Sequence, residues 1–232
     1  ASKDPKTLVQ AAAISALAKT KNTKYLQRHT YKVTYEETGN ELIATLKERE
    51  VIQLNQPKCN RHSLHNKIDI HYILTSFFNN AGYLCFAIQL LQTQNKIITT
   101  FEKQIEAKNF LSKIEKEFQL NEVDFNGETP ETYNARAQQV LTKYGLWGQN
   151  LAIVDKGRRV GEKSIILIVN GEIKGYGFFN LNYQLTQLSI LENLVTPLPN
   201  TLANQHILHT YLREHPRVKI LNLNEQKPFH NE

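Results

Sequence analysis

The stretch from Gly39 to Pro57 constrains the fold most, because it carries start, face and stop signals of a single helix. Asn40 is a favourable N-cap, and Glu41 in the first turn suits the positive end of the helix dipole. Pro57 predicts the end of the helix, since the residue before a proline usually leaves the α region. The expected apolar face consists of Leu42, Ile43, Leu46, Val51 and Leu54. The stretch therefore predicts an amphipathic helix, and residues 31–35 before it are rich in strand-forming side chains.

This helix and its exit resemble the C-terminal half of a GIY-YIG nuclease domain, the module found in excision-repair nucleases and their relatives. The matching residues are Glu41, Ala44, Leu46, Glu48 and Ile52 in the helix, and Pro57 and Asn60 in the family's P-x-Y-N end. Cys59 stands where the family usually has tyrosine. The resemblance implies that Glu48 is a catalytic metal ligand for Mg²⁺ or Mn²⁺ and that Asn60 supports the site. A carboxylate oxygen is the hard ligand that such ions prefer. The alternative is that Glu48 is an ordinary solvated glutamate.

The resemblance also implies that half of the active site is missing from this sequence. The GIY and YIG strands, with their tyrosines, would lie before residue 1, and the family's arginine would fall near Leu8. Residues 1–27 predict a helix, with Asp4 as cap and Pro5 in its first turn. The sequence contains no methionine, which is expected of a fragment, a processed product or an engineered chain. We therefore expect this chain to bind DNA and to hydrolyse it only with strands supplied from elsewhere.

The excess positive charge is concentrated in the same part of the sequence. The formal net charge is +6, and residues 1–67 carry 12 Lys and Arg against 6 Asp and Glu. Residues 68–232 carry 16 of each kind. A local basic excess predicts a phosphate-backbone partner, whereas the alternative is that it serves solubility alone. The candidate DNA contacts are Lys3, Lys6, Lys19, Lys21, Lys24, Lys58, Arg61 and Lys67.

The middle of the sequence predicts a hairpin, a third strand and two helices. Residues 72–78 and 83–91 flank a turn at 79–82, and residues 97–101 form a further short β-rich run. The first helix, 104–118, has an expected apolar face of Ile105, Phe110, Leu111 and Ile114. The second helix begins with Thr129 as cap and Pro130 at its first position and runs to about Tyr144. In the Bacteroidetes-type multidomain relatives a cysteine-rich stretch separates two such helices. Here that stretch is short and lacks cysteine, but the approach to the second helix, residues 127–136, is retained.

The last third predicts strands at 151–157, 164–179 and 218–223, and a helix at 202–213. Asn170-Gly171 is a strong hairpin turn. Asp155 at a strand end resembles the opening of an RNase H-like nuclease, whose chemistry needs several carboxylates. Glu192 and Glu214 are the remaining candidates, and the alternative is that Asp155 caps a turn.

Two histidine pairs lack the ligands of a metal site. His62 and His65, and His206 and His209, are each three residues apart, but no third ligand accompanies either pair. We interpret the second pair as ordinary surface or interface histidines.

These features predict an α+β protein in three parts. Residues 1–67 form a truncated GIY-YIG-like α/β segment, 68–148 an accessory region of hairpin and helices, and 149–232 a small α/β tail domain. The expected function is the DNA-binding part of a repair-type, structure-specific nuclease, inactive alone, with a protein or further nuclease domain as possible partner. The alternative is a non-catalytic scaffold. The sequence has no run near the roughly 18 apolar residues of a membrane helix, and two cysteines fit a reducing compartment, which predicts a cytoplasmic protein.

Overall fold

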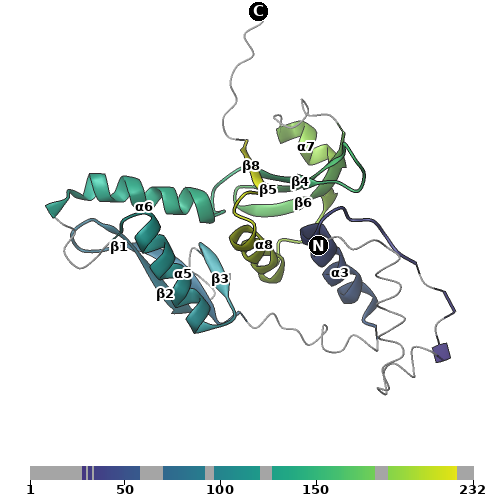
Figure 1. Cartoon of the computed structure of the whole chain (residues 1–232), viewed down its shortest axis with the longest axis horizontal. Coiled ribbons are helices and arrows are strands. Elements are labelled where there is room, and N and C mark those ends of the chain that lie inside the picture. The colour runs from purple at the N-terminus through teal and green to yellow at the C-terminus, as the bar shows by residue number, and fades with distance from the viewer. Residues whose placement is uncertain are drawn as a thin grey trace, which may run out of the picture.

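The computed structural model describes residues 28–29, 31–32, 34–57, 70–91, 97–120, 127–180 and 188–223. These residues form helices and two antiparallel sheets, which confirms the predicted α+β class. The predicted helix at 1–27 lies outside the described residues, and so does the basic stretch 58–67. Figure 1 shows the two sheets in separate parts of the molecule, with helix α8 between them.

The first sheet has the strand order β2-β1-β3. Its strands are β1 (Tyr72–Phe78), β2 (Leu84–Leu90) and β3 (Thr99–Phe101). The predicted hairpin is confirmed, because β1 and β2 pair antiparallel from Tyr72↔Leu90 to Phe78↔Leu84. The third strand pairs with the other edge of β1. Helices α5 (Gln104–Glu117) and α6 (Pro130–Tyr144) form one core with this sheet, built around Leu74, Phe86 and Phe101.

Helix α5 buries a narrower face than the sequence predicts. Ala107, Phe110 and Ile114 are buried, but Ile105 is 61% exposed, so its assignment to the apolar face was wrong. Five residues at 3.6 per turn place Ile105 about 140° away from Phe110 around the helix. Residues 107, 110 and 114, three and four positions apart, lie on the helix face that packs against the first sheet.

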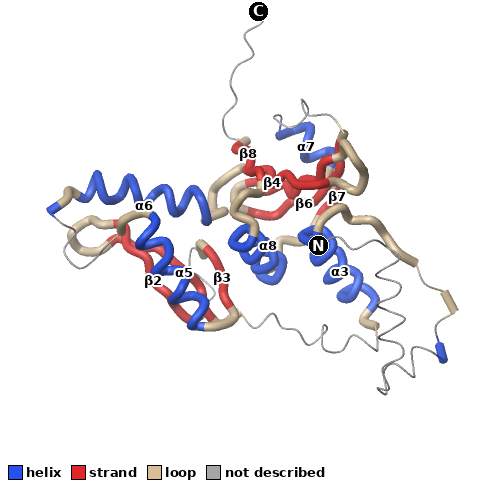
Figure 2. Tube along the Cα trace, in the orientation of Figure 1, coloured by secondary structure: helices blue, strands red, loops and turns tan. Residues whose placement is uncertain are grey.

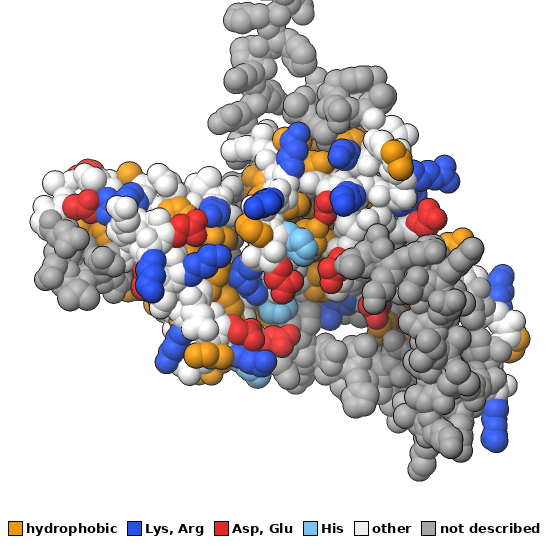
Figure 3. All heavy atoms as spheres, viewed as in Figure 1, with side chains coloured by type: hydrophobic (Ala, Val, Ile, Leu, Met, Phe, Trp, Pro, Cys, Tyr) orange, Lys and Arg blue, Asp and Glu red, His pale blue; other side chains and the backbone are white. Residues whose placement is uncertain are grey.

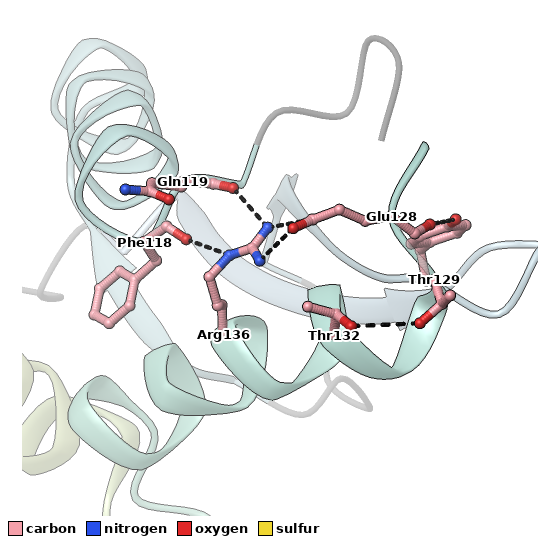
Figure 4. A network of polar contacts seen from close by, with 7 residues as sticks. Phe118, Gln119, Glu128, Thr129, Thr132 and Arg136 are labelled. Carbon is pink, nitrogen blue, oxygen red and sulfur yellow. Dashed lines mark hydrogen bonds and ion pairs between the residues drawn. The ribbon is translucent and has the colours of Figure 1, made fainter. Parts of the chain in front are cut away.

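Residues 127–136 join three elements of this part (Figure 4). The guanidinium of Arg136 donates to the carbonyls of Phe118 and Gln119 at the end of α5, over 3.1 and 3.2 Å, and forms an ion pair with Glu128. The side chain of Asn134 accepts from the Leu84 N–H over 2.7 Å and donates to the Gly82 carbonyl over 2.8 Å. Residues 127–136 therefore have a structural role: they hold the start of α6 against α5 and the hairpin.

The second sheet has the strand order β7-β6-β5-β4-β8, and every pair in it is antiparallel. Its strands are β4 (Leu151–Lys156), β5 (Lys163–Val169), β6 (Glu172–Phe179), β7 (Thr196–Pro197) and β8 (Lys219–Asn222). The tail is thus an antiparallel sheet with helices rather than the parallel arrangement of an α/β unit. The cause is local: Asn170 and Gly171 have φ of 53° and 82°, the type I′ geometry that joins β5 to β6 directly.

Among the described residues, three helices pack on the second sheet. Helices α3 (Glu41–Asn55) and α8 (Leu202–Glu214) share a core with Ile153, Ile166 and Tyr176. Helix α7 (Leu188–Leu194) packs with a second cluster that contains Val154 and Ile165. Because side chains alternate along a strand, the two clusters lie on opposite faces of the sheet. Figure 2 shows α7 on one side of the red strands and α3 and α8 on the other.

Candidate functional site

Helix α3 begins as predicted, and its cap also ties it to the second sheet. The side chain of Asn40 accepts from the Ile43 N–H over 3.0 Å, which confirms its role as N-cap. The same amide donates to the Lys156 carbonyl over 2.9 Å and to the Ser164 hydroxyl over 2.7 Å. One side chain therefore starts the helix and fixes it to β4 and β5.

The chain enters α3 through a close backbone contact with the β4–β5 connection. Gly39 has a φ of 77°, and a Cβ built on it would lie 2.4 Å from the carbonyl carbon of Gly157. A side chain at Gly39 would therefore collide with the backbone of Gly157. Glycine is required both because of this close contact and because of the positive φ. This contact sets where the first turn of α3 lies on the sheet.

Three of the five residues of the predicted apolar face of α3 are buried. Leu42, Ile43 and Leu46 are buried in the core of the second sheet, and Ile52 is also buried. Val51 and Leu54 are 51% and 76% exposed, so their assignment to the buried face was wrong. The shared core ends at Leu46, and the last turns of the helix extend beyond it. The helix predicted to belong to residues 1–67 thus shares its core with residues 149–232.

Glu48 is the predicted site residue that the structure describes. Its side chain is exposed, and no hydrogen bond or ion pair involves it within the described part of the chain. Asn60 and the eight predicted DNA contacts lie outside the described residues: Lys3, Lys6, Lys19, Lys21, Lys24, Lys58, Arg61 and Lys67. Across the described ranges, no group of three His, Cys, Asp or Glu side chains is placed to hold a metal ion. Glu48 fits Mg²⁺ only as a single carboxylate ligand, with water and phosphate oxygens completing the coordination.

Asp155 is engaged in the fold. Its carboxylate accepts from the N–H of Lys156 over 2.7 Å and from the Tyr211 hydroxyl. Burial, together with the bond to Asp155, raises the pKa of Tyr211. Glu192 and Glu214 are exposed, and they do not join Asp155 in a cluster of acidic ligands among the described residues. The hydrogen bonds of Asp155 give it a structural role, but not the predicted one of capping a turn: its carboxylate links β4 to α8.

The two histidines of α8 lie at the interface between the two parts of the molecule. The hydroxyl of Thr100 on β3 is 2.7 Å from Nδ1 of His206 and 3.5 Å from Nδ1 of His209. Burial, with a smaller contribution from the nearby charge of Arg213, lowers the pKa of His206 to about 4 and that of His209 to about 3. Of the two predicted alternatives, surface or interface, their burial excludes the surface and confirms the interface.

Arg213 is a residue that the sequence did not single out. Its guanidinium donates to the Thr99 hydroxyl and to the Thr100 carbonyl, the latter over 2.8 Å, and lies 4.5 Å from the centre of the Phe101 ring. Burial lowers its pKa to about 10. Together with His206 and His209 it forms the α8–β3 junction, the name used below for these three residues and their partners on β3. The sequence does contain a signal for this junction. Three residues that can carry positive charge, at 206, 209 and 213, fall on one face of the predicted helix.

Comparisons of the chain with protein-family models, curated proteins and solved structures found no match. The resemblance to GIY-YIG nucleases therefore rests on the motif residues of α3 and its exit. None of the described helices combines the length and the apolar character needed to cross a membrane.

Proposed function

We propose that this chain is the DNA-binding part of a repair-type, structure-specific nuclease. The observation that carries the proposal is Glu48: an exposed carboxylate without a protein partner among the described residues, on a helix whose start is fixed by Asn40. A second support is the basic excess of residues 1–67, the segment that contains this helix. We also propose that it acts in the cytoplasm; the support is the low cysteine content, because two cysteines in 232 residues give no disulfide framework.

Glu48 would hold a Mg²⁺ or Mn²⁺ ion, and Asn60 would support the site. Such an ion neutralises charge on a phosphate and polarises its oxygens. The lysines and Arg61 of residues 1–67 would contact the backbone and position the DNA. A metal ion held by one carboxylate needs further groups that activate the nucleophile and stabilise the developing charge, so we propose DNA binding rather than hydrolysis for these residues.

The test is binding of the chain to a branched DNA and to a duplex over a salt series, with and without Mg²⁺, while product formation is followed. We expect binding that weakens steeply with salt, with a slope of log K against log salt of about −0.9 per phosphate contacted, and no cleavage. Binding that does not respond to salt, or no binding, contradicts the proposal.

The role of Glu48 is tested separately with Mn²⁺ as the probe. Bound Mn²⁺ is counted by electron paramagnetic resonance in the DNA complex of the wild type, Glu48→Gln and Glu50→Gln. Glu50 is the matched control, because it carries the same charge two residues further along α3. We expect Glu48→Gln to lose the protein-dependent Mn²⁺ signal and Glu50→Gln to keep it. Equal signals from the two variants would show that Glu48 is not the ligand.

The alternative function is a non-catalytic scaffold that binds another protein. The observation that favours it is the exposure of Val51 and Leu54, three residues apart on α3 and on one side of that helix. Salt separates the two functions, because an apolar protein contact survives at a salt concentration that disrupts phosphate contacts.

A further inference from the structure

The connection between β4 and β5 carries an unusual concentration of exposed positive charge. Within residues 156–163 four basic side chains are exposed, whereas the one acidic residue is Glu162. The four are Lys156, Arg158, Arg159 and Lys163. Figure 3 shows Lys and Arg side chains over the upper part of the molecule, where the second sheet lies. We call residues 156–163 the basic hairpin.

Two of these charges face each other directly. Lys156 and Lys163 are cross-strand partners in the β4–β5 register, and both side chains lie on the face that carries Val154 and Ile165. Like charges directly opposite each other on antiparallel strands destabilise the pair. A register that places two lysines together therefore has a cost to the fold, which an anionic partner would remove.

Glu162 does not relieve this repulsion, because Arg158 occupies it. The backbone N–H and the guanidinium of Arg158 both donate to the Glu162 carboxylate, each over 2.7 Å. The guanidinium also lies 4.1 Å from the centre of the Phe178 ring. Hydrogen bonds from Arg158 lower the pKa of Glu162, which keeps that carboxylate charged in the pair. The nearby Glu36 is paired with Lys47 on α3.

The other three basic side chains have no partner in the described part of the protein. No hydrogen bond or ion pair involves the side chain of Lys156, Arg159 or Lys163 among the described residues. At the tip, Val160 is fully exposed between the two arginines and Gly161. The base of the hairpin is fixed, since Gly157 packs against Gly39 and the Lys156 carbonyl accepts from Asn40. The charges thus lie at the end of the sheet, on a connection whose base is fixed to the start of α3.

We propose that the basic hairpin contacts the phosphate backbone of duplex DNA through Lys156, Arg159 and Lys163. This inference rests on the proposed DNA binding and adds to it a site that the basic excess of residues 1–67 does not include. Duplex DNA carries one negative charge per roughly 1.7 Å of its axis, a density that suits three cations close together on one connection. Phosphates lie on the outside of the duplex, so exposed lysine and arginine side chains reach them without entering a groove.

The test compares two triple variants that remove the same charge. One is Lys156→Gln/Arg159→Gln/Lys163→Gln in the basic hairpin. The matched control is Lys108→Gln/Lys113→Gln/Lys116→Gln on the exposed side of α5. For each lost phosphate contact we expect about an eightfold weaker affinity at 0.1 M salt and a salt slope flatter by about 0.9. The hairpin variant should therefore flatten the slope by nearly three times that amount, and the control should leave it almost unchanged.

The outcomes separate this inference from the proposed function. If the wild type binds DNA and the hairpin variant binds equally well, the inference is overturned while DNA binding stands. Equal losses in the hairpin variant and the control also overturn it, because they show a response to net charge alone. If the wild type binds no DNA, the proposed function fails and the inference fails with it. Preferential binding to an RNA duplex or to anionic vesicles overturns the assignment to DNA.

A measurement on the wild-type chain covers the case in which the hairpin variant does not fold. Surface lysines are acetylated with and without a DNA duplex and located by mass spectrometry. We expect DNA to protect Lys156 and Lys163 several-fold more than Lys108 and Lys116. Equal labelling of all four lysines in the complex contradicts the inference.

Discussion

The α8–β3 junction and the basic hairpin both concentrate side chains that can carry positive charge. In the junction these side chains are buried or bonded, whereas in the hairpin most of them are exposed and without a partner among the described residues. In the junction, Arg213 is partly buried, bonded to β3 and stacked on Phe101, and two histidines are kept neutral by burial. In the hairpin, Lys156 and Lys163 are exposed and face each other without a partner among the described residues. The comparison teaches that the first set stabilises the fold, whereas the second set costs stability and requires an explanation outside the fold.

The largest effect is expected from Arg213→Met, which keeps the apolar volume but removes the donors to Thr99 and Thr100. The β3 acceptors lose charge-assisted hydrogen bonds in a buried interface, so we expect a loss of about 3 kcal/mol in the free energy of unfolding. Urea denaturation measures it. Arg217→Met is the control, because Arg217 is exposed just beyond α8. Similar losses in both variants would refute the assignment of Arg213 to the junction.

A smaller effect is expected from pH. An unfolded histidine has a pKa of about 6.5, and burial lowers the pKa of His206 to about 4 and of His209 to about 3. The unfolded chain therefore takes up protons first, and stability that is complete above pH 6.5 is lost as the pH falls toward these folded values. Each histidine contributes a slope of at most about 1.4 kcal/mol per pH unit, reduced where water reaches the ring.

The charges that face this pair are Arg213 on its own helix and Glu102 and Glu106 at the start of α5. Urea unfolding between pH 5 and 7 isolates the histidines, because carboxylates with a lowered pKa, such as those of Glu128 and Glu162, act below this window. We expect His209→Gln to flatten the dependence. His71→Gln, an exposed control, should leave it as in the wild type. A wild-type stability that is constant from pH 7 to 5 would contradict buried, neutral histidines.

The smallest effect, with the opposite sign, is expected from Lys163→Gln in the basic hairpin. Removing one of two directly opposed lysines should stabilise the protein by about 0.5 kcal/mol, and the gain should shrink in high salt because screening already weakens the repulsion. Thermal unfolding at two salt concentrations measures both. Lys174→Gln is the matched control, since Lys174 on β6 forms an ion pair with Glu172 over 2.8 Å and should gain nothing. A destabilised Lys163→Gln variant would remove the contrast between the two regions.

Local signals in the sequence predicted the elements that depend on local chemistry. The Asn40 cap, the Asn79–Gly82 hairpin turn and the Asn170-Gly171 turn are all present. What the sequence did not predict depends on distant partners. Periodicity marked Val51 and Leu54 as apolar, but only the end of the core at Leu46 decides that they are exposed. Helix α7 and strand β7 were missed because they are short.

In the candidate site, too, some features could be predicted from local sequence and others depend on distant residues. Motif residues were enough to select Glu48, and the structure adds that its carboxylate is exposed and unbonded within the described residues. The basic hairpin is a run of charges in the sequence, but the opposition of Lys156 and Lys163 follows only from the β4–β5 register. Arg213 was not selected, because its partners on β3 lie more than 100 positions earlier. Contacts between side chains of different strands, or of a helix and a strand, depend on the tertiary fold, and the spacing of residues along the chain does not predict them.

The packing of α3 also bears on how the protein is made. Leu42, Ile43 and Leu46 find their core partners in strands that begin at Leu151 and in a helix that begins at Leu202. A ribosome that adds roughly 5–20 residues per second needs on the order of 5–20 s to reach the first of these strands. During that interval the partners that cover its apolar face among the described residues are absent, and this face is open to chaperones. Chains that stop before β4 leave this face permanently uncovered.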